Sequence, residues 1–128
     1  MSIETKWAPK KHGDEAEARA LAHLRRSGLT LLERNYRLAR GPGRPAGEVD
    51  LILRDRDGSL VFVEVRSRSS GRFGGAAASV GAQKRRRLVR AAQHYLQRLP
   101  VWPPCRFDVV AIDGERLEWL RAAFDMQG

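Results

Sequence analysis

Two short segments with alternating side chains constrain this sequence more than any other feature. In residues 48–53 and 60–66, successive residues divide into two faces, one of which is uniformly aliphatic, as in a β-strand. Between them lies the sequence Arg56-Asp57-Gly58, whose glycine can adopt the left-handed conformation that a three-residue hairpin loop requires. The two segments are therefore predicted to form an antiparallel hairpin.

The register of this hairpin follows from its aliphatic face, because a shift by one residue would turn every side chain to the opposite side. Matching the aliphatic faces pairs Leu51 with Val63 and Val49 with Val65. On the other face the same register pairs Ile52 with Phe62, Asp50 with Glu64 and Glu48 with Arg66. Two acidic residues are thus predicted to face each other across neighbouring strands.

Directly opposed carboxylates destabilise a sheet unless something compensates their charge. A divalent cation held by the oxygens of Asp50 and Glu64 would do so. The alternative is that one of the two acids points to solvent, or that Arg66 neutralises both.

Two helices are predicted to bring further charged residues toward the same place. In residues 14–27, Glu17 lies on the apolar stripe formed by Ala20, Leu21 and Leu24. A glutamate on a buried stripe normally has a partner, although Glu17 could also extend to the edge of the helix. In residues 82–99, Lys84 begins the stripe of Leu88, Ala91, Tyr95 and Leu99, and a solvated lysine is its alternative.

The remaining segments complete an α/β domain. Residues 29–37, 105–112 and 117–122 are predicted strands, which gives the order α-β-β-β-α-β-β. The helix between the third and fourth strands allows a parallel crossover, so we expect a mixed β-sheet flanked by helices. Residues 1–12 are expected to be a flexible basic arm, 13–124 a single domain and 125–128 a tail, and the Gly-, Ser- and Ala-rich residues 67–81 a mobile loop.

The charge of the chain favours a polyanionic partner. Lys and Arg number 24 and Asp and Glu 15, a net charge of +9, which indicates nucleic acid before an anionic membrane surface. The predicted phosphate contacts are Arg85, Arg86, Arg87 and Arg90 on the second helix, Arg68 and Arg72 in the loop, and Lys10 and Lys11 in the arm. The alternative for the helix is an ordinary solvated face.

Other residues carry weaker signals. Trp7 and Trp102 could stack on bases or anchor irregular segments, and the three histidines have no metal-ligand spacing to acidic residues. Cys105 begins an apolar strand and is interpreted as a small buried side chain. Because no apolar run opens or crosses the chain, we expect a cytoplasmic protein that does not bind membranes.

Several short sequence motifs of this chain, taken together, resemble those of the YraN family. They are Gly47-Glu48-Val49-Asp50-Leu51-Ile52, Val61-Phe62-Val63-Glu64-Val65-Arg66 and Arg106-Phe107-Asp108-Val109-Val110, with Gly13, Glu17, Ala20, Leu24, Arg34, Asn35 and Lys84. The resemblance spans about Gly13 to Phe124. It implies a core similar in fold to PD-(D/E)xK nucleases, including archaeal Holliday-junction resolvases.

The resemblance also implies site roles. Asp50 and Glu64 would be the first and second motif acids and Glu17 the acid from the helix, together binding Mg²⁺ or Mn²⁺, with Glu48 as an accessory acid. Arg66 stands where the motif usually has lysine, and arginine does not readily lose a proton.

Two main functional hypotheses follow. The first is a metal-dependent endonuclease that cuts DNA, including branched or single-stranded forms, with Arg66 and Lys84 stabilising charge. The second is a DNA-binding module whose catalysis is impaired by Arg66. A protein-interaction module ranks below both. A homodimer is an expectation by analogy with resolvases.

Overall fold

The computed structural model describes residues 11–39, 45–68 and 80–127. Its elements, in chain order, are α2 (Lys11–Arg26), β1 (Thr30–Ala39), β2 (Pro45–Arg54), β3 (Leu60–Arg68), α3 (Ala82–Leu96), β4 (Cys105–Asp113) and β5 (Arg116–Phe124). The predicted α-β-β-β-α-β-β order is confirmed. The first helix begins three residues earlier than predicted, so part of the expected arm is helical. Nearly all of that arm and of the expected loop lies outside the described residues.

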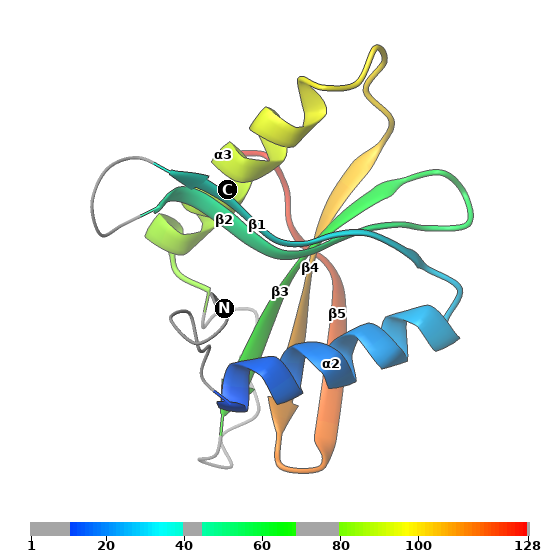
Figure 1. Ribbon diagram of the computed structural model, residues 1–128, viewed down its shortest axis with the longest axis vertical. Coiled ribbons are helices and arrows are strands. Elements are labelled where there is room, and N and C mark those ends of the chain that lie inside the picture. Colours follow the sequence, from blue (N-terminus) through cyan, green and yellow to red (C-terminus); the bar gives the residue numbers. More distant parts are fainter. Residues whose placement is uncertain (1–10, 40–44, 69–79, 128) are drawn as a thin grey trace, which may run out of the picture.

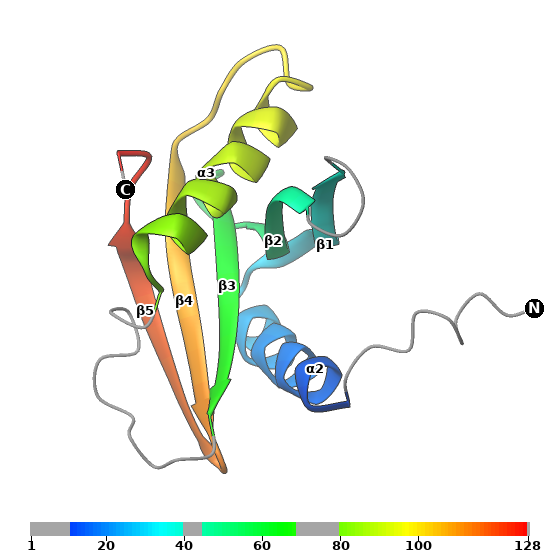
Figure 2. The same ribbon diagram turned by 90° about the vertical axis from the view of Figure 1, so that its left-hand side faces the viewer.

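The five strands form one mixed sheet in the order β1-β2-β3-β4-β5. All neighbours are antiparallel except β3 and β4, which are parallel and are joined through α3, as expected for a crossover. The two helices cover opposite faces of the sheet (Figures 1 and 2). Among the described residues, neither helix is long and apolar enough to cross a bilayer.

The alternation of the strands gives the sheet two cores. On the α2 side, Leu51, Leu53, Val61 and Val63 are buried against Ala20, Leu21 and Leu24. On the α3 side, Ile52 and Phe62 are buried against Leu88, Ala91, Ala92 and Leu96. A sheet buried on both faces explains why the even and the odd positions of the hairpin are both largely apolar.

The predicted register of the hairpin is confirmed over its first part. Leu53 pairs with Val61, Ile52 with Phe62 and Leu51 with Val63. The loop is the predicted one: the Asp55 backbone N–H donates to the Ser59 carbonyl, and Gly58 has a φ of +92°.

Beyond Leu51 the register prediction is wrong, because β2 and β3 separate there. The hydrogen-bonded ladder contains no pair between Val49, Asp50 or Glu48 and β3. Val49 belongs to the core on the α3 side, although strict alternation predicts it on the side of Leu51. Figure 1 shows the left-hand ends of β1 and β2 turning toward α3 while β3 continues downward.

The bend of β2 is matched in β1. Arg34 pairs with Leu51 and Tyr36 with Val49, so Asn35 lies beside Asp50 in the sheet. Asn35 has a φ of +52°, and asparagine is one of the few side chains that tolerate this left-handed conformation. Both strands therefore bend at the level of Asp50.

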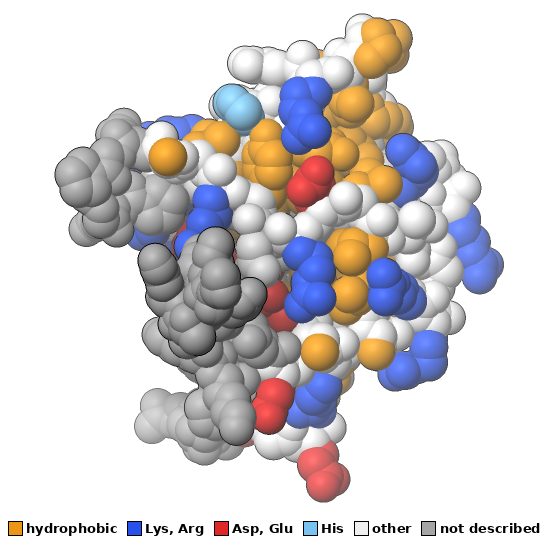
Figure 3. All heavy atoms as spheres, viewed as in Figure 1, with side chains coloured by type: hydrophobic (Ala, Val, Ile, Leu, Met, Phe, Trp, Pro, Cys, Tyr) orange, Lys and Arg blue, Asp and Glu red, His pale blue; other side chains and the backbone are white. Residues whose placement is uncertain are grey.

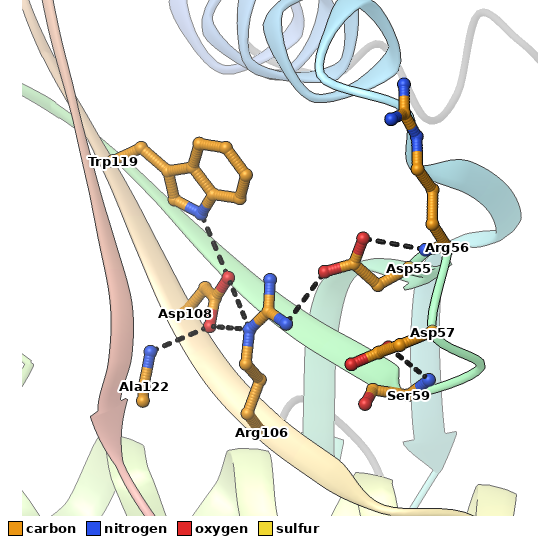
Figure 4. A network of polar contacts seen from close by, with 8 residues as sticks. All are labelled: Asp55, Arg56, Asp57, Ser59, Arg106, Asp108, Trp119 and Ala122. Carbon is orange, nitrogen blue, oxygen red and sulfur yellow. Dashed lines mark hydrogen bonds and ion pairs between the residues drawn. The ribbon is translucent and has the colours of Figure 1, made fainter.

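A second buried carboxylate lies on β4 and links this strand to its neighbours. Asp108 is fully buried in β4 and accepts hydrogen bonds from Arg106 Nε at 3.1 Å, Trp119 Nε1 at 2.9 Å and the Ala122 N–H at 2.9 Å (Figure 4). Arg106 also donates to Asp55 at 2.9 Å, which ties β4 to the hairpin loop. These donors compensate the burial of the charge and tie β4 to β5 and to the loop of the hairpin.

Candidate metal and nucleic-acid site

Asp50 and Glu64 lie where β2 and β3 separate. The Asp50 Oδ2 atom accepts a hydrogen bond of 2.8 Å from the Val65 backbone N–H. The Asp50 carboxylate thus takes the place of the backbone carbonyl that would accept the next hydrogen bond of the ladder. It links the two strands where their backbones no longer pair. Glu64 is adjacent to Val65 and is only 3% exposed. The predicted proximity of the two acids therefore holds, although a side chain and not a ladder pair produces it.

Burial raises the proton affinity of both acids. Burial, and next the charge of Asp50, raise the pKa of Glu64 to about 8. Burial also raises the pKa of Asp50, opposed by the Val65 hydrogen bond and by Lys84. At neutral pH the Glu64 carboxyl group therefore keeps its proton for most of the time.

Two basic side chains contact Glu64. Lys84 Nζ lies 3.4 Å and Arg66 Nη1 3.7 Å from Glu64 Oε2. The other oxygen, Glu64 Oε1, is buried and accepts no hydrogen bond from the residues that the structure describes. A buried carboxylate oxygen without a donor is suited to bind a cation.

Glu48 lies at the rim of this cluster and differs from its predicted partner. The sequence predicts that it faces Arg66, whereas Glu48 lies 3.5 Å from Lys84 Nζ and 3.5 Å from Arg37 Nε. The reason is the separation of the strands, which carries Glu48 with β2 toward α3. Lys84 therefore bridges an acid on each of the two separated strands.

Lys84 reaches both acids because α3 lies very close to β2. A Cβ atom added to Gly47 would lie 2.8 Å from the Arg87 carbonyl oxygen and 3.0 Å from the Ala91 nitrogen, so only glycine fits between strand and helix. The inward orientation predicted for Lys84 from its helical stripe agrees with this packing.

Glu17 has a different environment from the one predicted. It is largely buried on α2, with 14% of its side chain exposed, and its Oε1 atom lies 3.7 Å from Arg34 Nη2. Within the described ranges, no group of three His, Cys, Asp or Glu side chains is arranged to hold a metal ion. The role of Glu17 as a third metal ligand stays a prediction, and Arg34 provides an opposite charge beside it.

The predicted phosphate contacts on α3 divide into two groups. Arg86 and Arg90 are exposed and Arg87 is half-buried. Arg85 instead packs inward: its Nε donates to the Val80 carbonyl at 2.9 Å, and its guanidinium lies 5.2 Å from the centre of the Phe124 ring. Lys10 and Arg72 lie outside the described residues, as do the side chains of Lys11 and Arg68.

Sequence reasoning missed three features of the site. They are the bend at Asn35, the contact of Gly47 with α3 and the pairing of Arg37 with Glu48. Only the asparagine and the glycine gave a usable signal, since both residue types mark unusual backbone geometry.

Comparison with known proteins supports the family resemblance noted in the sequence, and it does so over most of the chain. Residues 16–112 match the model of uncharacterised protein family UPF0102. The UPF0102 protein of Methylibium petroleiphilum is 64% identical over 116 residues, covering 91% of this chain and 95% of that protein. That of Paracidovorax citrulli is 62% identical over 120 residues, covering 94% and 87%. The chain therefore belongs to the UPF0102, or YraN, family.

Proposed function

We propose that this protein is a metal-dependent endonuclease that hydrolyses phosphodiester bonds in DNA. The observation that carries the proposal is the acid pair of Asp50 and Glu64: burial raises the pKa of both groups, and Lys84 and Arg66 contact Glu64. Such a pair is costly to bury, and strongly perturbed acids are concentrated at functional sites. The compatible α/β fold and the predicted motif blocks support the assignment to a PD-(D/E)xK-like core.

The residues present fit a small divalent cation. Mg²⁺ is usually bound through one or two carboxylates and completes its coordination with water and substrate phosphate oxygens. Asp50 and Glu64 would supply the two carboxylates, and the lack of a hydrogen-bond donor to Glu64 Oε1 among the described residues favours this. When bound, Mg²⁺ or Mn²⁺ would polarise the phosphate and lower the pKa of an attacking water. Glu17, which contacts Arg34, is not needed for this minimal ligand set.

Lys84 has a position suited to the role of the missing motif lysine. Its ammonium group lies 3.4 Å from Glu64, from which it can stabilise negative charge that develops on the phosphate. Arg66 lies on the other flank of the same carboxylate and keeps its charge at every pH of interest. In this proposal Arg66 binds and orients the phosphate, and Lys84 interacts with the attacking or leaving oxygen.

The affinity for DNA would come from the positive charge around the site. Arg86, Arg87 and Arg90 follow Lys84 on α3, and the net charge of the chain is +9. Contacts of arginine with phosphates confer affinity without sequence preference and weaken as salt increases. A cytoplasmic location and a homodimer belong to the same proposal.

Cleavage assays test the proposal directly. Purified protein is incubated with linear, nicked, branched and single-stranded DNA in the presence of Mg²⁺, Mn²⁺ or EDTA. We expect metal-dependent cleavage, and we expect Asp50→Asn and Lys84→Met each to reduce its rate at least a hundredfold. Glu115→Gln, which changes an exposed residue in the turn between β4 and β5, is the control and should have no effect. Absence of cleavage on every substrate, or full activity of Asp50→Asn, would reject the nuclease assignment.

A second candidate is a DNA-binding module without catalysis. The observation that favours it is that Lys84 and Arg66 both contact Glu64 and so compensate its charge without a metal. This candidate predicts salt-sensitive DNA binding that is unchanged by EDTA. The Arg66→Lys variant distinguishes the two: a gain of cleavage would indicate a nuclease impaired at this position.

A further inference from the structure

A line of basic side chains leads away from the acid pair along one flank of α3. Arg90, His94 and Arg98 follow one another at four-residue intervals and all three are exposed. This spacing puts them on the same side of the helix and of the turn that follows it. The flank is the one next to β1 and β2, since Arg90 Nη1 donates to the Ala46 carbonyl at 3.0 Å and His94 Nδ1 lies 2.7 Å from the Tyr36 hydroxyl.

The far end of this line is aromatic. The Arg98 guanidinium lies 4.9 Å from the centre of the Tyr95 ring and 5.8 Å from that of Tyr36. The two tyrosines are themselves in edge-to-face contact at 5.4 Å. Glu33 is an acidic neighbour of Arg98. In Figure 3, a histidine, basic side chains and a hydrophobic surface lie together beside α3 at the upper end of the molecule.

The segment after α3 adds exposed apolar side chains. Val101 is 76% and Trp102 55% exposed, and they are the exposed large hydrophobic residues of the described part of the chain. The sequence left open whether Trp102 anchors this segment or can stack on a ligand. An exposure above one half leaves much of its surface available for a ligand.

We propose that this flank of α3 binds an unpaired nucleic-acid strand, with phosphates along Arg90 and His94 and a base stacked at Arg98 or Trp102. The proposal rests on the proposed nucleic-acid function and specifies its substrate. The combination of positively charged and planar side chains favours an unpaired strand over a duplex. Bases can stack on guanidinium or aromatic planes only when they are released from a duplex. A purely apolar protein partner would gain nothing from the three basic groups.

The dimensions suit a strand that continues from the acid pair. The helical rise puts His94 about 15 Å along the axis from Lys84, which corresponds to about four nucleotides at the spacing of stacked bases. One strand could therefore have its scissile phosphate at Asp50 and Glu64 and its flanking bases at the aromatic end.

Binding measurements in EDTA test this without any cleavage. A fluorescent oligothymidylate of about 12 nucleotides, within the length range of single-strand grooves, is titrated with wild-type protein and variants. We expect Arg98→Ala to weaken binding about tenfold, as for the loss of one stacked base, and to affect a duplex of the same length much less. Arg98→Lys should recover only the salt-dependent part of the lost binding free energy, because lysine keeps the positive charge but lacks the planar guanidinium group on which a base can stack.

Arg25→Ala is the matched control, since Arg25 is an exposed arginine on α2 across the sheet. Single-stranded DNA should also quench tryptophan fluorescence in the wild type, and less so in Trp102→Phe. Equal losses for Arg98→Ala and Arg25→Ala, equal losses on single-stranded and duplex DNA, or no binding of the oligonucleotide would each overturn the proposal. Asp50→Asn separates the two proposals, because it should abolish cleavage and retain Arg98-dependent binding. Binding that depends on Arg98 in a protein that cuts nothing would keep this inference and reject the nuclease.

Discussion

Replacing Glu64 with glutamine is expected to protect the protein from a loss of stability that the wild type undergoes as the pH rises. The glutamine side chain resembles the protonated glutamic acid in shape, so the variant represents the neutral form at every pH. In the wild type, burial and the Asp50 charge raise the pKa of Glu64 from 4.5 to about 8. A raised carboxyl pKa contributes stability that is fully present below about pH 4.5 and is lost as the pH rises through about 8.

The size of the effect follows from the same pKa values. Each tenfold change in proton affinity corresponds to about 1.4 kcal/mol, so ionising Glu64 in the folded protein would reduce the free energy of unfolding by at most about 5 kcal/mol. Lys84 and Arg66 are already included in this balance, since both lower the pKa of Glu64. The loss is expected to develop between about pH 5 and pH 9.

Urea unfolding followed by circular dichroism between about pH 5 and pH 9 measures this difference. The wild type should lose stability over the interval, and Glu64→Gln should lose several kcal/mol less. Glu115→Gln, at an exposed position, should follow the wild type. Parallel curves for the wild type and Glu64→Gln would show that Glu64 titrates normally, and the account of the acid pair would then fail.

Three further predictions concern the cation, the packing of Gly47 against α3 and the hydrogen bonds of Asp108. At saturating Mg²⁺, about a hundred times the dissociation constant, the wild type should gain about 2.7 kcal/mol in thermal denaturation. At one fixed Mg²⁺ concentration the gain should be larger near pH 8 than near pH 6, because the cation must displace the proton of Glu64; an equal gain in Asp50→Asn would contradict this. Gly47→Ala should cost about 1–3 kcal/mol in urea unfolding, since the added carbon meets the α3 backbone. Gly81→Ala, with open space around it, is its control, and equal stability of the two variants would refute the close packing. Asp108→Ala should cost about 3–5 kcal/mol in the same assay, because it leaves Arg106 and Trp119 without their buried acceptor. A loss no larger than that of Asp113→Ala would show that the network in Figure 4 contributes little.

The sequence alone determined the elements and much of the hairpin. Alternation and a glycine turn are local signals, so the pairing of Leu51 with Val63 and the loop ending at Gly58 could be predicted from adjacent residues. The same holds for Lys84, whose orientation follows from its position on a helical stripe.

Tertiary structure decided how the site is assembled. Strict alternation extends the ladder through Asp50, but β1 and β2 bend there toward α3, and the freed Val65 N–H binds the Asp50 carboxylate instead. Asparagine and glycine indicate unusual backbone geometry, but the direction of the bend depends on the left-handed Asn35 in one strand and on the approach of α3 to Gly47 in another. The observed partners of Glu17 and Glu48 differ from those expected from the sequence. A charged side chain pairs with the opposite charge that lies nearest to it, and the packing of helices and strands decides which charge that is.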